Sequence, residues 1–127
     1  MPRLYDHIDL RVPSLAAVEN FYRQLLPALG FTREQDIEDW LQFEDESGAQ
    51  FFGITESPSH RANENRIAFH ARDTAEVDRL AAIARAAGAL NLEGPMDYEE
   101  NYYAVFFEDP CGNRFEVCHR KLPASGG

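Results

Sequence analysis

The sequence has few cysteines and no long hydrophobic run, and each shortage excludes a class of protein. Only Cys111 and Cys118 carry thiols among the 127 residues, and they do not form a Cys-x-x-Cys pair. A disulfide framework and a Cys-x-x-Cys redox or zinc site are therefore excluded, and two reduced thiols in a cytoplasmic protein are expected. Charged residues interrupt the first twelve positions, so we expect no secretory signal. No apolar segment approaches the roughly 20 residues of a membrane-spanning helix.

Positive charge is also scarce. The chain has 12 basic against 22 acidic residues, a net charge of −10, and Lys121 is its single lysine. Binding to nucleic acid or to anionic membranes requires a basic surface, so we expect neither as a partner. Apolar residues make up 44% and aromatic residues 12% of the chain. This is enough for a packed core and excludes a disordered chain.

A repeat organises the sequence that is present. Residues 6–14, DHIDLRVPS, align without gaps with residues 65–73, NRIAFHARD, so that His7 aligns with Arg66. Each copy alternates apolar and polar residues, which is typical of a strand with one buried face. Apolar residues at helical spacing follow each copy. Each half therefore begins with a strand and then a helix.

Residues with capping preferences set the ends of the two helices. Ser14 is a predicted N-cap, and Asp73 with Glu76 forms a variant of the capping box. Gly30 and Gly88 can end the helices, because glycine tolerates the left-handed conformation common at C-caps.

Short strand-like runs follow each helix. Residues 93–101 lack clear periodicity, and we expect them to form a mobile lid. The turns EDESG and EDPCGN separate the last two strands of each half. The predicted strands are 31–36, 40–43 and 50–55 in the first half and 89–92, 102–107 and 114–119 in the second. The sequence thus predicts an α+β fold of two tandem βαβββ modules, residues 1–58 and 64–120, in one domain with a flexible tail, 121–127.

One face of these sheets is unusually polar. The leading strands place His, Asp and Arg opposite their apolar residues, and Glu116 lies on the polar face of the last strand. Aromatic residues, including Trp40 and Phe52, belong to strands of the same sheets. Mixed polar and aromatic lining favours a concave pocket, although a solvated sheet face is the alternative.

Three segments, 7–31, 66–89 and 102–119, resemble the vicinal oxygen chelate superfamily, which includes glyoxalases, extradiol dioxygenases and the fosfomycin and bleomycin resistance proteins. The turn from Asp109 to Glu116, DPCGNRFE, is the most specific part of the likeness. The resemblance implies two βαβββ modules whose sheets curl around a cavity. It also implies a homodimer and a small-molecule substrate or ligand.

In metal-dependent relatives the ligands come from four positions, which the resemblance carries to His7, Phe52, Arg66 and Glu116. A guanidinium and a phenyl ring offer no lone pair, so only His7 and Glu116 remain as metal ligands. His70 shares the face of Arg66, but four residues of strand separate them by about 13 Å. A divalent metal (Zn, Ni, Mn or Fe) and no metal at all are both left open.

Two hypotheses for the function follow, with a third beside them. The first is a metal-dependent lyase, isomerase or dioxygenase in which His7 and Glu116 are catalytic. The second is a metal-free protein that sequesters a small aromatic or anionic ligand. Here Arg66 is either the anchor for the ligand or the ion-pair partner of Glu116. The third is an interaction protein whose cleft is filled by its own side chains. The predicted ligand-binding residues are Arg66, His70, Phe52, Trp40 and Tyr103, with Tyr102 beside them.

Overall fold

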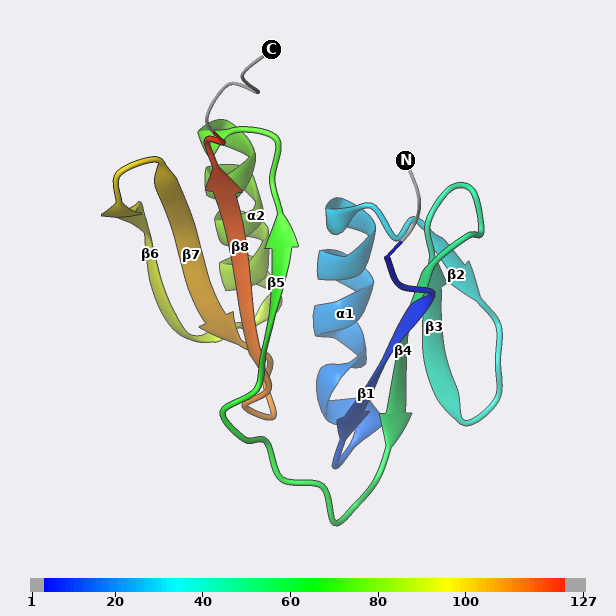
Figure 1. Ribbon diagram of the computed structural model, residues 1–127. Helices are drawn as coiled ribbons and strands as arrows, with labels where there is room; N and C mark the ends of the chain where they lie inside the picture. The colour runs from blue at the N-terminus through cyan, green and yellow to red at the C-terminus, as the bar shows by residue number, and fades with distance from the viewer. Residues whose placement is uncertain (1–3, 123–127) are drawn as a thin grey trace.

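The computed structural model describes residues 4–122 and contains two four-stranded sheets, each with its own helix (Figure 1). Residues 123–127 of the predicted tail lie outside the described residues. The first module consists of β1 (His7–Val12), α1 (Leu15–Leu29), β2 (Arg33–Gln35), β3 (Trp40–Glu44) and β4 (Phe51–Glu56). The second consists of β5 (Arg66–His70), α2 (Thr74–Ala87), β6 (Leu90–Glu99), β7 (Tyr102–Glu108) and β8 (Arg114–Arg120).

The two sheets have the same topology. Sheet A has the strand order β1-β4-β3-β2, and sheet B has the order β5-β8-β7-β6. In each sheet the first and last strands of the module pair in parallel, while the other pairs are antiparallel. The predicted α+β fold of two βαβββ modules is therefore confirmed.

The helix caps are formed by the residues that the sequence indicated. The Ser14 hydroxyl accepts a hydrogen bond from the Ala17 N–H at 3.3 Å, and the Asp73 carboxylate accepts one from the Glu76 N–H at 2.8 Å. The Glu76 carboxylate accepts a hydrogen bond from the N–H of Arg72, at 3.0 Å, rather than from the N–H of the N-cap residue itself. These bonds satisfy N–H groups that have no partner inside the helix.

The segment predicted as a lid belongs largely to a strand. β6 continues through Glu99 and pairs with β7, with register shifts along its length. These irregularities break the alternation of apolar and polar residues, which is why no strand pattern is visible in the sequence. Gly94, with φ 88°, is required at this point, because a Cβ atom would lie 2.8 Å from the carbonyl oxygen of Ala104.

Both modules contribute to one hydrophobic core. α1 packs against α2, and Figure 1 shows α1 between the two sheets. The rings of Phe52 from β4, Phe69 from β5 and Phe115 from β8 lie with centroids 6.0–6.3 Å apart. Because the helices and these rings cover the inner face of each sheet, the other face of each sheet is left open.

A buried polar contact joins the modules. Asp109, which begins the β7–β8 turn, is completely buried and accepts a hydrogen bond from the Tyr22 hydroxyl of α1 at 2.5 Å. It also accepts bonds from the N–H of Cys111 at 2.8 Å and from the N–H and Nδ2 of Asn113 at 3.0 Å each. One carboxylate therefore shapes the DPCGN turn and attaches it to the opposite module.

Alkaline pH is expected to weaken this contact. Burial, with the Asp109 carboxylate second, raises the pKa of Tyr22 well above 10.0, so the folded state keeps a proton that the unfolded chain releases. The stabilisation that comes from the raised pKa of Tyr22 is complete below about pH 10 and is lost as pH rises beyond it. Urea unfolding at about pH 8 and pH 11 should show a smaller loss of stability for Tyr22→Phe than for the natural protein. Tyr5→Phe, at an exposed side chain, is the control. Equal losses in all three proteins would contradict this assignment.

Candidate functional site

The open face of sheet A is hollowed around Trp40. His7 stacks on Phe51 with ring centroids 4.4 Å apart, and its Nδ1 lies 2.8 Å from the carboxylate of Asp6. Trp40 donates its indole N–H to Gln42 at 3.2 Å and remains 39% exposed. We call this region the Trp40 hollow; it measures about 350 Å³ and is lined by His7, Asp9, Arg11, Trp40, Gln42, Phe51, Gly53 and Thr55.

The open face of sheet B is arranged in rows by strand register. One row places Arg66, Arg114 and Glu108 side by side on β5, β8 and β7, and the next places Ala68, Glu116 and Phe106 side by side. The Arg66 hollow, of about 580 Å³, opens at this end of the sheet. Its lining residues are Arg66, Asn91, Glu93, Tyr98, Phe106, Phe107, Glu108, Arg114 and Phe115.

Arg66 and Glu116 do not bond to each other. The guanidinium carbon of Arg66 lies 4.8 Å from the ring centroid of Phe106, and within residues 4–122 no ion pair joins Arg66 to Glu116. Glu116, which is 7% exposed, instead accepts a hydrogen bond from the Tyr102 hydroxyl. The ion-pair alternative therefore does not describe this structure: Arg66 stacks on an aromatic ring and keeps its N–H groups free of carboxylates.

The pKa of Tyr102 should depend on its contact with Glu116. Burial, followed by the hydrogen bond to Glu116, raises the pKa of Tyr102 to about 12. Glu116→Gln should lower this pKa while leaving it above 10, because burial remains. Glu108→Gln, on the same open face, is the matched control and should have little effect. The titration can be followed by NMR of the Tyr102 ring; an unchanged value in Glu116→Gln would contradict the contact.

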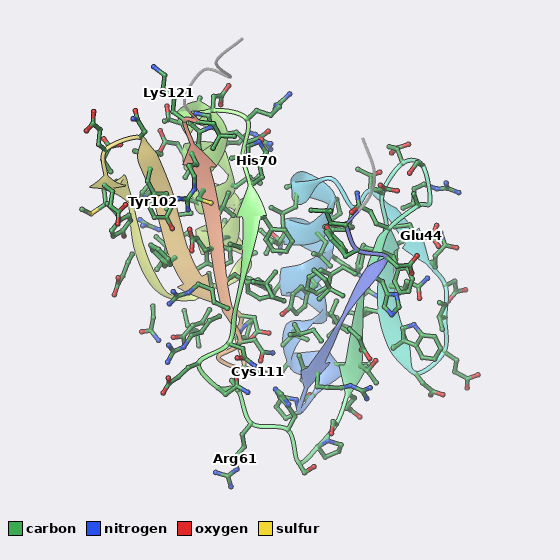
Figure 2. All side chains as sticks on the ribbon, in the orientation of Figure 1. Glu44, Arg61, His70, Tyr102, Cys111 and Lys121 are labelled. Carbon is green, nitrogen blue, oxygen red and sulfur yellow. The ribbon has the colours of Figure 1, made fainter. Side chains whose placement is uncertain are left out.

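The predicted site residues are divided between separate places. His7 and Trp40 lie on sheet A, whereas Arg66 and Glu116 lie on sheet B, and the two hollows share no residue. Figure 2 shows the same separation, with Tyr102 and His70 labelled on sheet B and Glu44 labelled across the molecule on sheet A. One chain therefore does not bring His7 and Glu116 together.

His70 does not join Arg66 either. It contributes to a third hollow, of about 210 Å³, with Tyr5, Asp45 and Gln50 among its other lining residues. Its ring lies 6.5 Å from that of His119, whose Nδ1 is 3.1 Å from the carbonyl oxygen of Ala71. Within the described chain, His70 is thus not placed to replace a ligand at position 66.

Two predicted ligand-binding residues lie on the core side of their sheets. Phe52 is completely buried, and Tyr103 donates its hydroxyl to Asp78 of α2 at 2.5 Å. Neither lines the Trp40 hollow or the Arg66 hollow. Phe51 and Tyr102, their neighbours in the sequence, occupy the open faces.

A difference in turn length explains the misplacement of Phe52. In the first module the N–H of Asp45 bonds to the carbonyl oxygen of Gln50, whereas in the second the N–H of Asp109 bonds to the carbonyl oxygen of Asn113. The turn of the first module is therefore one residue longer. The alignment therefore shifts after the turn. Ile8 pairs with Phe52 as Ile67 pairs with Phe115, and Asp9 pairs with Gly53 as Ala68 pairs with Glu116. The counterpart of Glu116 in the first module is Gly53, which has no side-chain ligand either.

The sequence did not indicate that Tyr98, Phe106 and Arg114 line a hollow together. Tyr98 lies in the irregular strand β6, where no periodicity assigns its face. Phe106 and Arg114 are brought beside Glu116 and Arg66 by strand pairing. That juxtaposition depends on register, which the sequence of each strand does not specify by itself.

These residues do not fit a resident metal ion. Across residues 4–122 there is no group of three or more His, Cys, Asp and Glu side chains that could hold one. Of the four positions that the resemblance indicates, Arg66 and Phe52 provide no donor atom, and Gly53, the counterpart of Glu116 by strand pairing, provides none either.

The chain is a paired-module α+β protein. Its two βαβββ modules share one core, and the open face of each sheet has a polar and aromatic hollow. The chain belongs to the glyoxalase/bleomycin resistance protein/dioxygenase superfamily, whose family model matches residues 4–117. A search of curated proteins found no match. Within residues 4–122, no helix is both long and apolar enough to cross a membrane.

Solved structures with the same fold include members from several bacteria. A glyoxalase/bleomycin resistance protein from Albidiferax ferrireducens T118 is 25% identical, with 94% of this chain and 100% of that chain covered and a TM-score of 0.78. A glyoxalase/bleomycin resistance protein/dioxygenase family enzyme from Burkholderia phytofirmans PsJN is 19% identical, with 91% and 98% covered and a TM-score of 0.72. The fosfomycin resistance protein FosX from Listeria monocytogenes is 21% identical, with 98% and 97% covered and a TM-score of 0.69.

Proposed function

We propose that this protein binds a small molecule on the open face of sheet B without a metal ion, and sequesters it without chemical conversion. The observation that carries the proposal is Arg66. It stands where the resemblance places a metal-ligating histidine, it stacks on Phe106, and within the described chain it makes no ion pair. A cation at this position repels a metal ion and attracts an electron-rich ligand.

We propose that the working unit is a homodimer in which sheet A of one copy covers sheet B of the other. Support comes from the two separate hollows, each lined by residues of a single sheet. The pairing would bring His7 and Trp40 of one copy over Arg66 and Glu116 of its partner. Light scattering on the purified protein should give about twice the chain mass of 14.4 kDa. A monomer at all concentrations would contradict this arrangement.

Metal analysis tests the metal-free proposal directly. The purified protein is treated with a chelator, incubated with Zn, Ni, Mn or Fe, dialysed, and measured by elemental analysis. We expect no metal to be retained in a stoichiometric amount, because His7 and Glu116 are too few ligands even when two copies meet. Matched samples of His7→Ala and Glu116→Ala should give the same result. Stoichiometric metal that both substitutions remove would favour a metal-dependent lyase, isomerase or dioxygenase.

A sequestering protein also returns its ligand unchanged. A bound compound recovered after denaturation should have the mass it had before binding, whereas an enzyme would release a product. We propose a cytoplasmic location, which the two free thiols support.

A further inference from the structure

We propose that Arg66 and Arg114 together clamp one oxyanion, a carboxylate or a phosphonate, attached to an aromatic ring. This inference rests on the proposed metal-free binding at the Arg66 hollow and names the chemical class of its ligand. Phosphonates and carboxylates share the required chemistry, since each offers two oxygen atoms to a guanidinium.

Strand register makes Arg66 and Arg114 neighbours on the open face of sheet B. Arg66 of β5 and Arg114 of β8 are direct partners in a parallel pair, and both side chains line the Arg66 hollow. Side chains at paired positions on one face of a sheet are near neighbours. Two like charges at such positions repel each other unless an anion lies between them, so the bare pair favours a bound anion.

The guanidinium groups are not neutralised inside the chain. Neither Arg66 nor Arg114 makes an ion pair with a described residue, although Glu108 is the register partner of Arg114. Glu108 instead accepts a hydrogen bond from the amide of Asn91 at 3.0 Å. The guanidinium carbon of Arg66 lies over the ring of Phe106, which leaves its N–H groups available to a ligand because no described carboxylate bonds to them.

The rest of the hollow determines what the anion can be attached to. Tyr98 and Phe106 form an edge-to-face pair with centroids 5.0 Å apart, which provides an aromatic wall. The volume of about 580 Å³ suits a small molecule. Glu93 and Glu108 line the same hollow from β6 and β7, so a ligand with several spread negative charges is disfavoured. The overall charge of −10 likewise gives no general attraction for anions, which leaves the arginine pair as the source of specificity.

Calorimetry on chelator-treated full-length protein tests the clamp. The probes are phenylphosphonate and benzoate, compared with neutral benzyl alcohol and cationic benzylamine. We expect the two anions to bind at least about 10-fold more tightly than the other two compounds. Arg66→Gln and Arg114→Gln should each weaken phenylphosphonate binding by about 10- to 100-fold. Arg61→Gln removes the same charge from the linker, outside the Arg66 hollow, and is the matched control.

The outcomes separate the clamp from the proposed function. Binding of benzyl alcohol as tight as that of phenylphosphonate, or phenylphosphonate binding that survives both hollow substitutions, overturns the clamp but leaves metal-free binding intact. No binding of either anion also overturns the clamp. Binding of the anions only after a divalent metal is added overturns the proposed function itself. Circular dichroism of each variant ensures that a lost affinity is not lost folding.

Discussion

Asp109→Ala is expected to lower the free energy of unfolding by about 3–5 kcal/mol. The carboxylate is completely buried and accepts hydrogen bonds from four donors, of which the Tyr22 hydroxyl comes from the opposite module. Removing it leaves these donors without their partner in a region that water does not reach. Urea denaturation followed by circular dichroism measures the change as a shift in the transition midpoint.

Asp45→Ala is the matched control for this experiment. Asp45 begins the corresponding turn of the first module and bonds to Ser47, Ala49 and Gln50, but it is not in the buried core. Its loss should cost much less than the loss of Asp109, because water can replace the broken bonds. Equal costs at Asp45 and Asp109 would show that the DPCGN turn is no more than a local turn, and that its attachment to α1 contributes little.

Phe52→Ala is expected to cost about 3–5 kcal/mol. The side chain is completely buried, and its ring lies 5.9–6.3 Å from the rings of Tyr22, Phe31, Phe69 and Phe115. The substitution would open a cavity where β4, β5, β8 and α1 meet, so both modules would be weakened together. Thermal or urea unfolding should show one cooperative transition at lower stability.

Phe51→Ala distinguishes this role from a role in binding. Phe51 is half-buried on the open face and stacks on His7. We expect a loss below about 1.5 kcal/mol and a change in the environment of Trp40 that fluorescence detects. The reverse result, with Phe51→Ala the more damaging to stability, would mean that the register of β4 has been assigned to the wrong face.

The arrangement of the modules has a consequence for the site. Because the two sheets cover a common core, each has an open face of its own, and His7 and Glu116 lie on different sheets. A single chain has two separate hollows, the Trp40 hollow and the Arg66 hollow. The proposed homodimer is the arrangement that would make them one cavity.

The repeat in the sequence was sufficient to predict the order of the helices and strands. Alternation identified β1 and β5, and the caps at Ser14 and Asp73 fixed the starts of both helices, because these signals depend on neighbouring residues only. Only the start of β6 was predicted, as residues 89–92, since register shifts interrupt the alternation in the rest of the strand. Phe52 was assigned to the wrong face because one additional residue in a turn reverses the face of every residue that follows it.

The sequence by itself therefore determined the two-module fold, the net negative charge and the presence of Arg66 where the resemblance implies a metal ligand. Only the tertiary structure decided which side chains share a hollow. It separated Arg66 from His70, moved Tyr103 and Phe52 to the core side, gave Glu116 the Tyr102 hydroxyl as its partner, and set Arg114 beside Arg66. The physical reason is that periodicity places a residue on one side of its own strand, whereas a site is built from residues on different strands. Their alignment depends on long-range backbone pairing and turn length.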